Sequence, residues 1–498
     1  MPKHYSIAID GPSGAGKSSL SKKISAAYHF AYLDTGAIYR TVGLAAGRAG
    51  IDRHSEQELS AILPDLHIEI RYDDSDMKFW GASQLIVNLS RDILDDLFKV
   101  YSRDDALKTY VIAVLRTIEK GLVDYEIQEA YDLDYISVLY PRVPLSKDTV
   151  GRHLFDLGRV CSRITEFMEL RCTKVPSNHS IAIDGMLKSY ESNDDIFSEF
   201  SRKALKKGTR DVSVVFAYDI DAAEPVCSKI YAGNQTDMSV FKDFLESSKL
   251  QNGFIITDKG FSYNTAKTVF LDNPGLHFLI PLKRDATAID EYKALKMDHT
   301  LTNRFGIESR KIRMPDGRHL YAFRDLEIAK IEEEVWVEEH KDYSPEELET
   351  MRTEFGSIVF ISDLDVIPEV MFAAYEERWE LEVMFRFYKH ILGMDETRVE
   401  SEMSVIGTEF VNFISVIMMC RLRKAFYRVE RLQKRSFKAN MKLLRKGIMI
   451  RHEVGGEWLP RQITDKEEQI FVELGLLQAP EKVPKKRGRP VGSKNRKK

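Results

Sequence analysis

The sequence has little cysteine and no long apolar segment. Its four cysteines are scattered with no metal-type spacing, so we expect reduced core residues in an intracellular protein. We find no apolar run of about 18 residues, so no membrane span is expected. The N-terminus has neither the basic start nor the apolar stretch of a signal peptide. Disulfide frameworks, cysteine-bound zinc sites and membrane association are therefore not expected.

The composition that is present describes a soluble protein with an uneven distribution of charge. A chain of 498 residues with 43% hydrophobic and 30% charged residues suits about three globular domains. The net charge is −4, yet Lys482–Lys498 holds nine Lys or Arg and no acid, so the remainder carries −4 − 9 = −13. A basic tail on an acidic body indicates a polyanionic partner bound at one end.

A phosphate-binding motif begins the chain. The apolar segment Ser6–Ile9 predicts a strand, and a helical pattern follows to Ala27. Between them lies Gly11-x4-Gly16-Lys17-Ser18, a P-loop in the right context. Its backbone N–H groups would cradle phosphates, Lys17 would reach the β- and γ-phosphates, and Ser18 would hold Mg²⁺.

The residues around this loop carry a family resemblance. Ile9–Ser18 and the segment Tyr32–Arg40, which reads YLDTGAIYR, closely resemble the N-terminus of bacterial cytidylate kinases. The resemblance implies that Thr35 and Arg40 help bind CMP. It extends to about Tyr72 and then stops.

The second half of such a kinase is missing from the sequence. We find no later Gly-Arg-Asp stretch and no arginine-rich lid, although a kinase must surround the transferred phosphoryl group with cations. We therefore interpret residues 1–77 as a truncated, inactive P-loop kinase fragment with a junction near Met77. ATP could bind at this remnant but is not expected to be needed.

The remaining chain predicts an α/β architecture. Residues 78–180 are largely helical in pattern and form a candidate DNA-binding region. From 181 to 400 the order is three strands, a helix, a strand and finally an acidic helix near Glu369–Ile391, as in a ribonuclease-H-like core. A β-rich insertion at about 283–356, with one helix near Ser344–Met351, precedes that last helix. Residues 401–480 are predicted to form a further helical region, with helices from Glu402 to Met449. Residues 481–498 form the basic tail.

One segment of the helical region has a helix-turn-helix character. In Leu145–Leu154, Ser146 can cap a helix. Polar side chains suited to DNA contact follow it, namely Lys147, Thr149, Arg152 and His153. An ordinary capped helix in a helical bundle explains the segment equally well, since docking needs a second helix that the sequence does not reveal.

Two aspartates are predicted where apolar strands end. Asp184 follows Ile181–Ile183, and Asp258 follows Gly253–Thr257. Carboxylates at the carboxyl ends of strands point into the crevice where α/β folds bind ligands. Taken alone, turn chemistry is the favoured explanation of each, because Asp-Gly pairs commonly end strands.

A third carboxylate lies on the predicted acidic helix. At about 100° per residue, Tyr375, Arg378, Glu382 and Lys389 share an arc of about 60°. Such a stripe suits a carboxylate that faces a metal, with cations beside it for phosphates. A solvated face with salt bridges at helical spacing is the alternative.

Together these residues resemble a family. Tyr375-x2-Arg378-x3-Glu382-x6-Lys389 looks like the Y-R-E-K signature of insertion-sequence DDE transposases. Asp184 and Asp258 match that family's two strand carboxylates, and Gly233–Asp237 resembles a stretch often found between them. The resemblance covers roughly residues 79–498.

The resemblance implies a function and its site. Asp184, Asp258 and Glu382 would be catalytic and would bind two Mg²⁺ or Mn²⁺ ions for DNA cleavage and strand transfer. Tyr375, Arg378 and Lys389 would contact DNA phosphates. The partners would be double-stranded terminal inverted repeats and target DNA, bound by a homodimer in the bacterial cytoplasm at the nucleoid.

The tail adds a second candidate DNA contact. Lys485–Pro490, which reads KKRGRP, resembles an AT-hook, in which Arg487 and Arg489 would lie in a narrow minor groove. A generic basic tail that binds phosphates is the alternative.

Two other functions compete with a transposase that carries an inert kinase remnant. The chain could be a bifunctional or ATP-regulated protein, or a (d)CMP kinase that uses the P-loop. It could also be a catalytically dead DNA-binding protein, although the intact set of Asp184, Asp258 and Glu382 argues against that.

Overall fold

The chain forms two compact units, Met1–Ser75 and Asp76–Lys498. The structure, a computed structural model, describes residues 76–190, 210–233, 237–394, 401–451 and 456–478, positions 235, 396 and 397, and scattered positions between 9 and 63. In the first unit, Lys17 is helical and its carbonyl accepts a hydrogen bond of 2.9 Å from Ser21. The other P-loop and CMP-site candidates lie outside the described residues, namely Gly11, Gly16, Ser18, Thr35 and Arg40.

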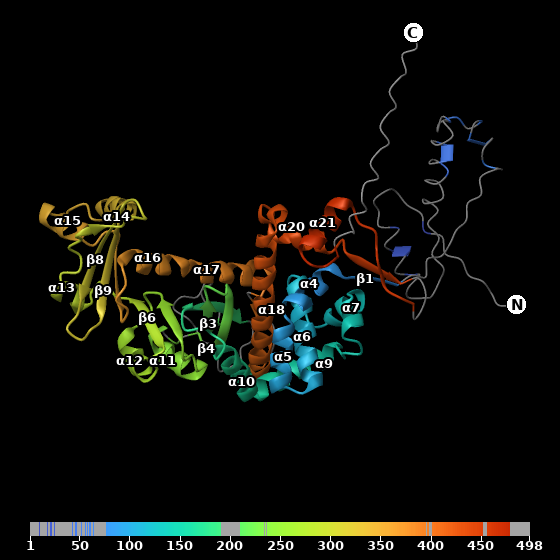
Figure 1. The fold of residues 1–498 in the computed structure, drawn as a ribbon, viewed down its shortest axis with the longest axis horizontal. Coiled ribbons are helices and arrows are strands. Elements are labelled where there is room, and N and C mark those ends of the chain that lie inside the picture. The colour runs from blue at the N-terminus through green and yellow to red at the C-terminus, as the bar shows by residue number, and fades with distance from the viewer. Residues whose placement is uncertain are drawn as a thin grey trace, which may run out of the picture. The chain divides into compact units, whose positions relative to one another are not determined.

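The second unit begins with a short strand and a set of helices (Figure 1). After β1 (Asp76–Phe79) come α4 (Gly81–Leu89), α5 (Arg91–Val100), α6 (Arg103–Ile118), α7 (Ile127–Leu133), α8 (Ile136–Leu139), α9 (Lys147–Arg159) and α10 (Cys161–Cys172). The largely helical pattern predicted for 78–180 is confirmed. Their apolar faces meet in one core, to which α6 contributes Tyr110–Leu115, all at most 1% exposed.

Helix α9 is the segment with the predicted helix-turn-helix character. Lys147 and Arg152 are exposed on it, but His153 is 4% exposed and shares a 2.9 Å hydrogen bond with Thr109 of α6. The prediction that His153 could contact DNA is therefore wrong, because α9 turns this side chain into the bundle. Ser146 stands before α9 as predicted, but its hydroxyl bonds the Thr149 hydroxyl instead of a backbone N–H.

Helix α9 crosses the long helix α18 (Glu402–Arg428) very closely. A Cβ atom on Gly158 would lie 1.8 Å from the Met403 carbonyl oxygen, and one on Gly407 would lie 1.9 Å from that of Leu154. Only glycine fits at both positions, because the absence of a side chain on each helix leaves room for the backbone of the other.

The mixed sheet of the second unit is the frame of the α/β fold. Its first part comprises β2 (Ser180–Tyr190), β3 (Arg210–Asp219), β4 (Glu224–Ala232), β5 (Gly253–Thr257) and β6 (Leu276–Pro281) in the order β4-β3-β2-β5-β6. Strands β2, β3 and β4 are antiparallel, whereas β5 and β6 run parallel to β2. The helices α11 (Asp237–Ser248) and α12 (Tyr263–Asp272) connect β4, β5 and β6. The predicted α/β class and strand sequence are confirmed.

The insertion extends this sheet. It comprises α13 (Thr287–Glu291), β7 (His299–Thr300), β8 (Ile307–Arg313), β9 (His319–Asp325), α14 (Leu326–Glu339), α15 (Pro345–Arg352) and β10 (Ser357–Ser362). Strand β10 joins β6 antiparallel and adds the β10-β9-β8-β7 ladder. The prediction of one helix here is wrong. The sequence does not predict α14 because the helix has no buried apolar face: only Ala329 is buried on it, while Ile328 and Ile331 are exposed.

The acidic helix and the C-terminal helices complete the unit. The predicted helix is found as α16 (Pro368–Glu377), α17 (Trp379–Arg386) and the π-helical turn η2 (Phe387–Ile391). After β11 (Glu396–Thr397) and α18 come α19 (Glu430–Gln433), α20 (Phe437–Leu444), β12 (Ile448–Arg451), β13 (Leu459–Pro460) and α21 (Asp465–Glu473). Strand β12 corrects the expectation of helix to Met449, because it pairs with β1 and β13.

Helix α18 lies between the sheet and the N-terminal helices (Figure 1). By length and composition alone it could cross a membrane. However, 83% of its most apolar window is buried inside the structure, which identifies it as a central core helix. Its apolar residues pack against both the sheet and the N-terminal helices.

The buried His153 makes stability depend on pH. Burial lowers the pKa of its imidazole from 6.5 to about 4, with Lys108 adding to the lowering and Asp105 opposing it. The unfolded chain therefore takes up this proton first, so acidification from pH 6.5 to 4 should lower the unfolding free energy, by at most about 3 kcal/mol. In His153→Gln this pH-dependent contribution is absent. Urea unfolding of wild type and variant at pH 6.5 and at pH 4 should therefore give a difference in unfolding free energy that changes with pH. A pH-independent difference would contradict this assignment.

Candidate active site

The first carboxylate lies inside a strand. Asp184 is partly buried on β2, opposite Phe216 of β3, and its Oδ1 accepts a 2.8 Å hydrogen bond from the Gly185 N–H. The prediction that Asp184 ends its strand is wrong, because β2 continues to Tyr190 in register with β3. Asp184 is therefore held by its pairing with β3, one residue beyond the end of the ladder with β5.

The second carboxylate follows the neighbouring strand directly. Strand β5 ends at Thr257, as predicted, and Asp258 comes next. Ile183 of β2 pairs with Thr257 of β5 in the parallel ladder. Asp184 and Asp258 thus follow paired residues on adjacent strands and lie at one level of the sheet.

The third carboxylate meets the first through an arginine. Arg378, at the junction of α16 and α17, donates from Nη2 to Glu382 Oε1 at 2.8 Å. Its Nη1 lies 3.8 Å from Asp184 Oδ2. The helix that carries Glu382 is therefore joined to the strand that carries Asp184 by one guanidinium group.

All three carboxylates act on this guanidinium. Burial by itself lowers the pKa of Arg378, but Tyr375 and the carboxylates Asp258, Glu382 and Asp184 more than offset it, so the pKa is raised above its usual value. Arg378 thus contacts Glu382 and lies near Asp184, while Asp258 directly follows the strand next to that of Asp184.

Tyr375 closes one side of this cluster. Arg378 stacks 5.5 Å from the centre of its ring, and the ring packs against Phe360 at 4.5 Å. Burial raises the pKa of the Tyr375 hydroxyl, Asp258 and Glu382 raise it further, and Arg378 opposes them. The hydroxyl therefore stays protonated.

Two donors of Arg378 remain available. In the described part of the chain its Nε and Nη1 are buried and have no hydrogen-bond acceptor. Donors of this kind can bond water or a ligand oxygen. Phosphate oxygens match the guanidinium fork.

Lys389, the last residue of the predicted stripe, lies in η2 and is partly exposed. Among the described residues no ion pair joins it to Asp184, Asp258 or Glu382. The regular spacing of 100° per residue ends at Phe387, where the π-helical turn begins.

Sequence reasoning missed a buried polar network behind this site. Lys188 lies on the same face of β2 as Asp184, four residues further on, and is 2% exposed. Its Nζ forms an ion pair with Glu409 of α18 and donates to the Tyr388 hydroxyl at 3.2 Å. The Tyr388 hydroxyl also donates to Glu409, and Asn412 donates to Glu409 at 3.1 Å.

This network ties β2, η2 and α18 into one body. Tyr388 follows Phe387 at the start of the π-helical turn and is fully buried. Arg116 of α6 extends the network by donating to the Asn412 amide oxygen at 3.1 Å. The signal in the sequence is Glu409, a lone acid among the apolar residues of α18.

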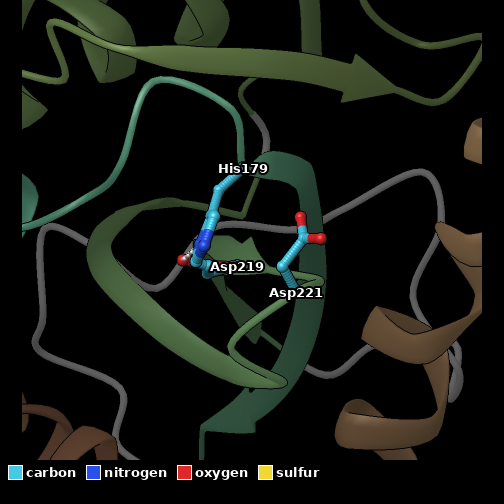
Figure 2. A group of neighbouring side chains, drawn as sticks. All are labelled: His179, Asp219 and Asp221. Carbon is cyan, nitrogen blue, oxygen red and sulfur yellow. Dashed lines mark hydrogen bonds and ion pairs between the residues drawn. The ribbon is translucent and has the colours of Figure 1, made fainter.

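A separate cluster has metal-type side chains. Figure 2 shows His179, Asp219 and Asp221, whose ligand atoms lie within 4.8 Å of one another. His179 Nδ1 bonds Asp219 Oδ2 at 2.7 Å, and the aspartates accept from the Ala222 and Ser180 N–H groups. These bonds account for the cluster as a brace of the β3–β4 turn. Asp184, Asp258 and Glu382 do not form so compact a group.

Comparison with known proteins decides which family this site resembles. Residues 180–406 match the family model described as a transposase DDE domain. The chain carries a transposase DDE domain. The matched range runs from β2 into α18 and includes Asp184, Asp258, Glu382 and their arginine.

The N-terminal part is similar to a different family. Residues 7–132 match the cytidylate kinase family model. The cytidylate kinase of Anoxybacillus flavithermus is 45% identical over 71 residues, 14% of this chain and 32% of that protein. That of Bacillus pumilus is 49% identical over 70 residues, 14% of this chain and 31% of that protein. The chain thus spans about a third of the length of these relatives.

The resemblance to kinases extends further than residue 77 in some comparisons. The cytidylate kinase of Mycolicibacterium paratuberculosis is 34% identical over 122 residues, 24% of this chain and 54% of that protein. The family-model match to residue 132 likewise includes α4–α6 and most of α7, which belong to the second compact unit.

One solved structure shows a remote likeness. It is a piggyBac transposase synaptic complex with hairpin DNA, 14% identical, with a TM-score of 0.40 over 73% of this chain and 77% of that chain. This likeness supports no functional inference.

The Lys188–Glu409 ion pair should contribute little to the free energy of unfolding and should act mainly by selecting one arrangement of β2 and α18. Glu409→Leu leaves Lys188 charged and buried and should cost about 3–5 kcal/mol of unfolding free energy. The double variant Lys188→Met/Glu409→Leu removes both charges and should lose much less. Urea unfolding of the two variants measures this. If the double variant is the less stable of the two, the pair is a net stabiliser and this interpretation is wrong.

Proposed function

We propose that this chain is a DDE transposase that cleaves DNA at the ends of an insertion element and transfers the cut strand. The observation that supports the proposal is the contact of Arg378 with Glu382 and Asp184 inside a matched DDE domain, with Asp258 directly after the adjacent strand. Carboxylates from two adjacent strands and one helix would then share a reaction centre.

The donor set fits a hard divalent cation. Three carboxylates supply the oxygen ligands that Mg²⁺ prefers, and Mn²⁺ accepts the same set. When bound, two such ions would supply activation of water or a DNA 3′-hydroxyl and stabilisation of the leaving oxygen. Asp184, Asp258 and Glu382 would hold them.

Arg378 and its neighbours would position the DNA. The unsatisfied Nε and Nη1 of Arg378 would donate to phosphate oxygens beside the cut. Tyr375 holds the guanidinium plane by stacking, so the fork is oriented before DNA arrives. Lys389 would contribute charge from η2 to the same strand.

The partner would be double-stranded DNA, both as terminal inverted repeats and as target. A homodimer would hold two element ends in the bacterial cytoplasm, at the nucleoid. Arg487 and Arg489 of the basic tail would enter an A·T minor groove. These two residues lie outside the described residues.

The kinase-like stretch would be inert in this function. The chain spans 32% of the cytidylate kinase of Anoxybacillus flavithermus, and the sequence shows no arginine-rich lid. We therefore expect no CMP phosphorylation. The competing function, ATP use through the P-loop, rests on the cytidylate kinase match and on Lys17.

Two substitutions separate these functions. Glu382→Gln keeps the shape of the side chain but removes a charged ligand, so excision of the element should fall by at least about a hundredfold. Lys17→Ala should leave excision unchanged. Excision of a marked element is measured for both variants, with wild type as the reference. If Lys17→Ala lowers excision as much as Glu382→Gln does, the P-loop participates and the inert-remnant proposal fails.

A further inference from the structure

A concave basic surface lies on the C-terminal helices, away from the three carboxylates in sequence. It encloses a cavity of about 770 Å³ between α19, α20 and α21. Five cations line it, and we call them the basic groove: Arg431, Arg435, Lys442, Lys446 and Lys466. Glu467 is the one acidic side chain in the lining.

Helix α20 forms one wall because its two faces differ. Asn440, Met441, Leu443 and Leu444 are buried and anchor the helix to the core. Lys442 lies three residues after Ala439 on the groove face, and Lys446 follows four residues later.

The opposite wall is the first turn of α21, and two contacts join the walls. Arg431 donates to the Gln469 side chain at 2.6 Å, and Lys446 forms an ion pair with Glu467. Glu467 also caps its own helix through Thr464. The groove is therefore a built feature of three helices and not the surface of one.

The lining of the groove carries an excess of positive charge, five cations against Glu467. Residues 428–446 contain eight Lys or Arg and one acid, in a chain whose net charge is −4. All five groove cations are exposed, and in the part of the chain that the structure describes only Lys446 among them forms an ion pair. Like charges held together repel one another, so such a surface favours a polyanion.

The distribution of charge favours the backbone of double-stranded DNA. The cations come from three helices along an open groove, which suits a row of phosphates better than one small anion.

We infer that the basic groove binds the phosphate backbone of double-stranded DNA. The groove would be a second DNA contact, separate from the carboxylate site. This inference rests on the proposed transposase function, which supplies the duplex.

The test is DNA binding by the full-length chain without divalent metal, so that no cleavage occurs. The probe is a labelled duplex carrying an element end, titrated between about 50 and about 200 mM salt. In Arg435→Ala/Lys442→Ala, two phosphate contacts should disappear. The slope of log affinity against log salt should become shallower by about 1.8, since each phosphate contributes about 0.9. Affinity near the lower salt limit should fall on the order of tenfold.

The matched control is Lys330→Ala/Lys341→Ala, which removes two exposed cations on and beside α14. This pair should keep the wild-type slope, and both double variants should keep the wild-type melting temperature. An unchanged slope in the groove variant, or an equal change in the control, would overturn the inference. An equal loss of binding to polyglutamate would overturn it too, because the groove would then recognise acidic protein.

Failure here is distinguishable from failure of the proposed function. If Glu382→Gln abolishes excision while the groove variant binds DNA normally, the function stands and the groove inference falls. If the groove variant loses DNA binding while Glu382→Gln excises normally, the groove inference stands as a DNA contact and the carboxylate site is wrong.

Discussion

The buried contact among Lys188, Tyr388 and Glu409 is the constraint on which the geometry of the site depends. It joins β2, the turn after α17 and the core helix α18. Asp184 is four residues from Lys188, and Glu382 is six residues from Tyr388, so this contact sets how the strand and helix carboxylates face each other. Burying an ion pair has a desolvation cost that well-packed apolar residues would avoid. We interpret the pair as a device that selects one arrangement of strand and helix.

A second electrostatic balance operates at the site itself. Carboxylates that face one site repel one another unless a cation lies among them. Arg378 supplies that cation, paired with Glu382 at 2.8 Å and near Asp184 at 3.8 Å. Its stacking on Tyr375 and its unsatisfied donors leave it ready to contact phosphate as well. One guanidinium thus links the proposed metal ligands with the proposed DNA contact.

Local pattern was sufficient to predict much of this unit. The apolar run Gly253–Thr257 gave β5 its bounds and placed Asp258 directly after it, because a buried parallel strand is a short continuous apolar segment. Asp184 was misplaced at a strand end, since the pairing that carries β2 to Tyr190 comes from β3, a distant segment. Helix α14 and the Glu409 network were missed for a related reason. The exposed apolar residues of α14 hide its period, and a buried ion pair depends on tertiary contacts.

The most direct test of the central claim is to locate bound metal. Crystals of the protein with element-end DNA and Mn²⁺, measured by anomalous scattering, should show density between Asp184, Asp258 and Glu382, and Asp258→Asn should weaken it. The account predicts that Arg378 then contacts a phosphate beside that density. Anomalous density at His179, Asp219 and Asp221 with none among the three carboxylates would contradict it.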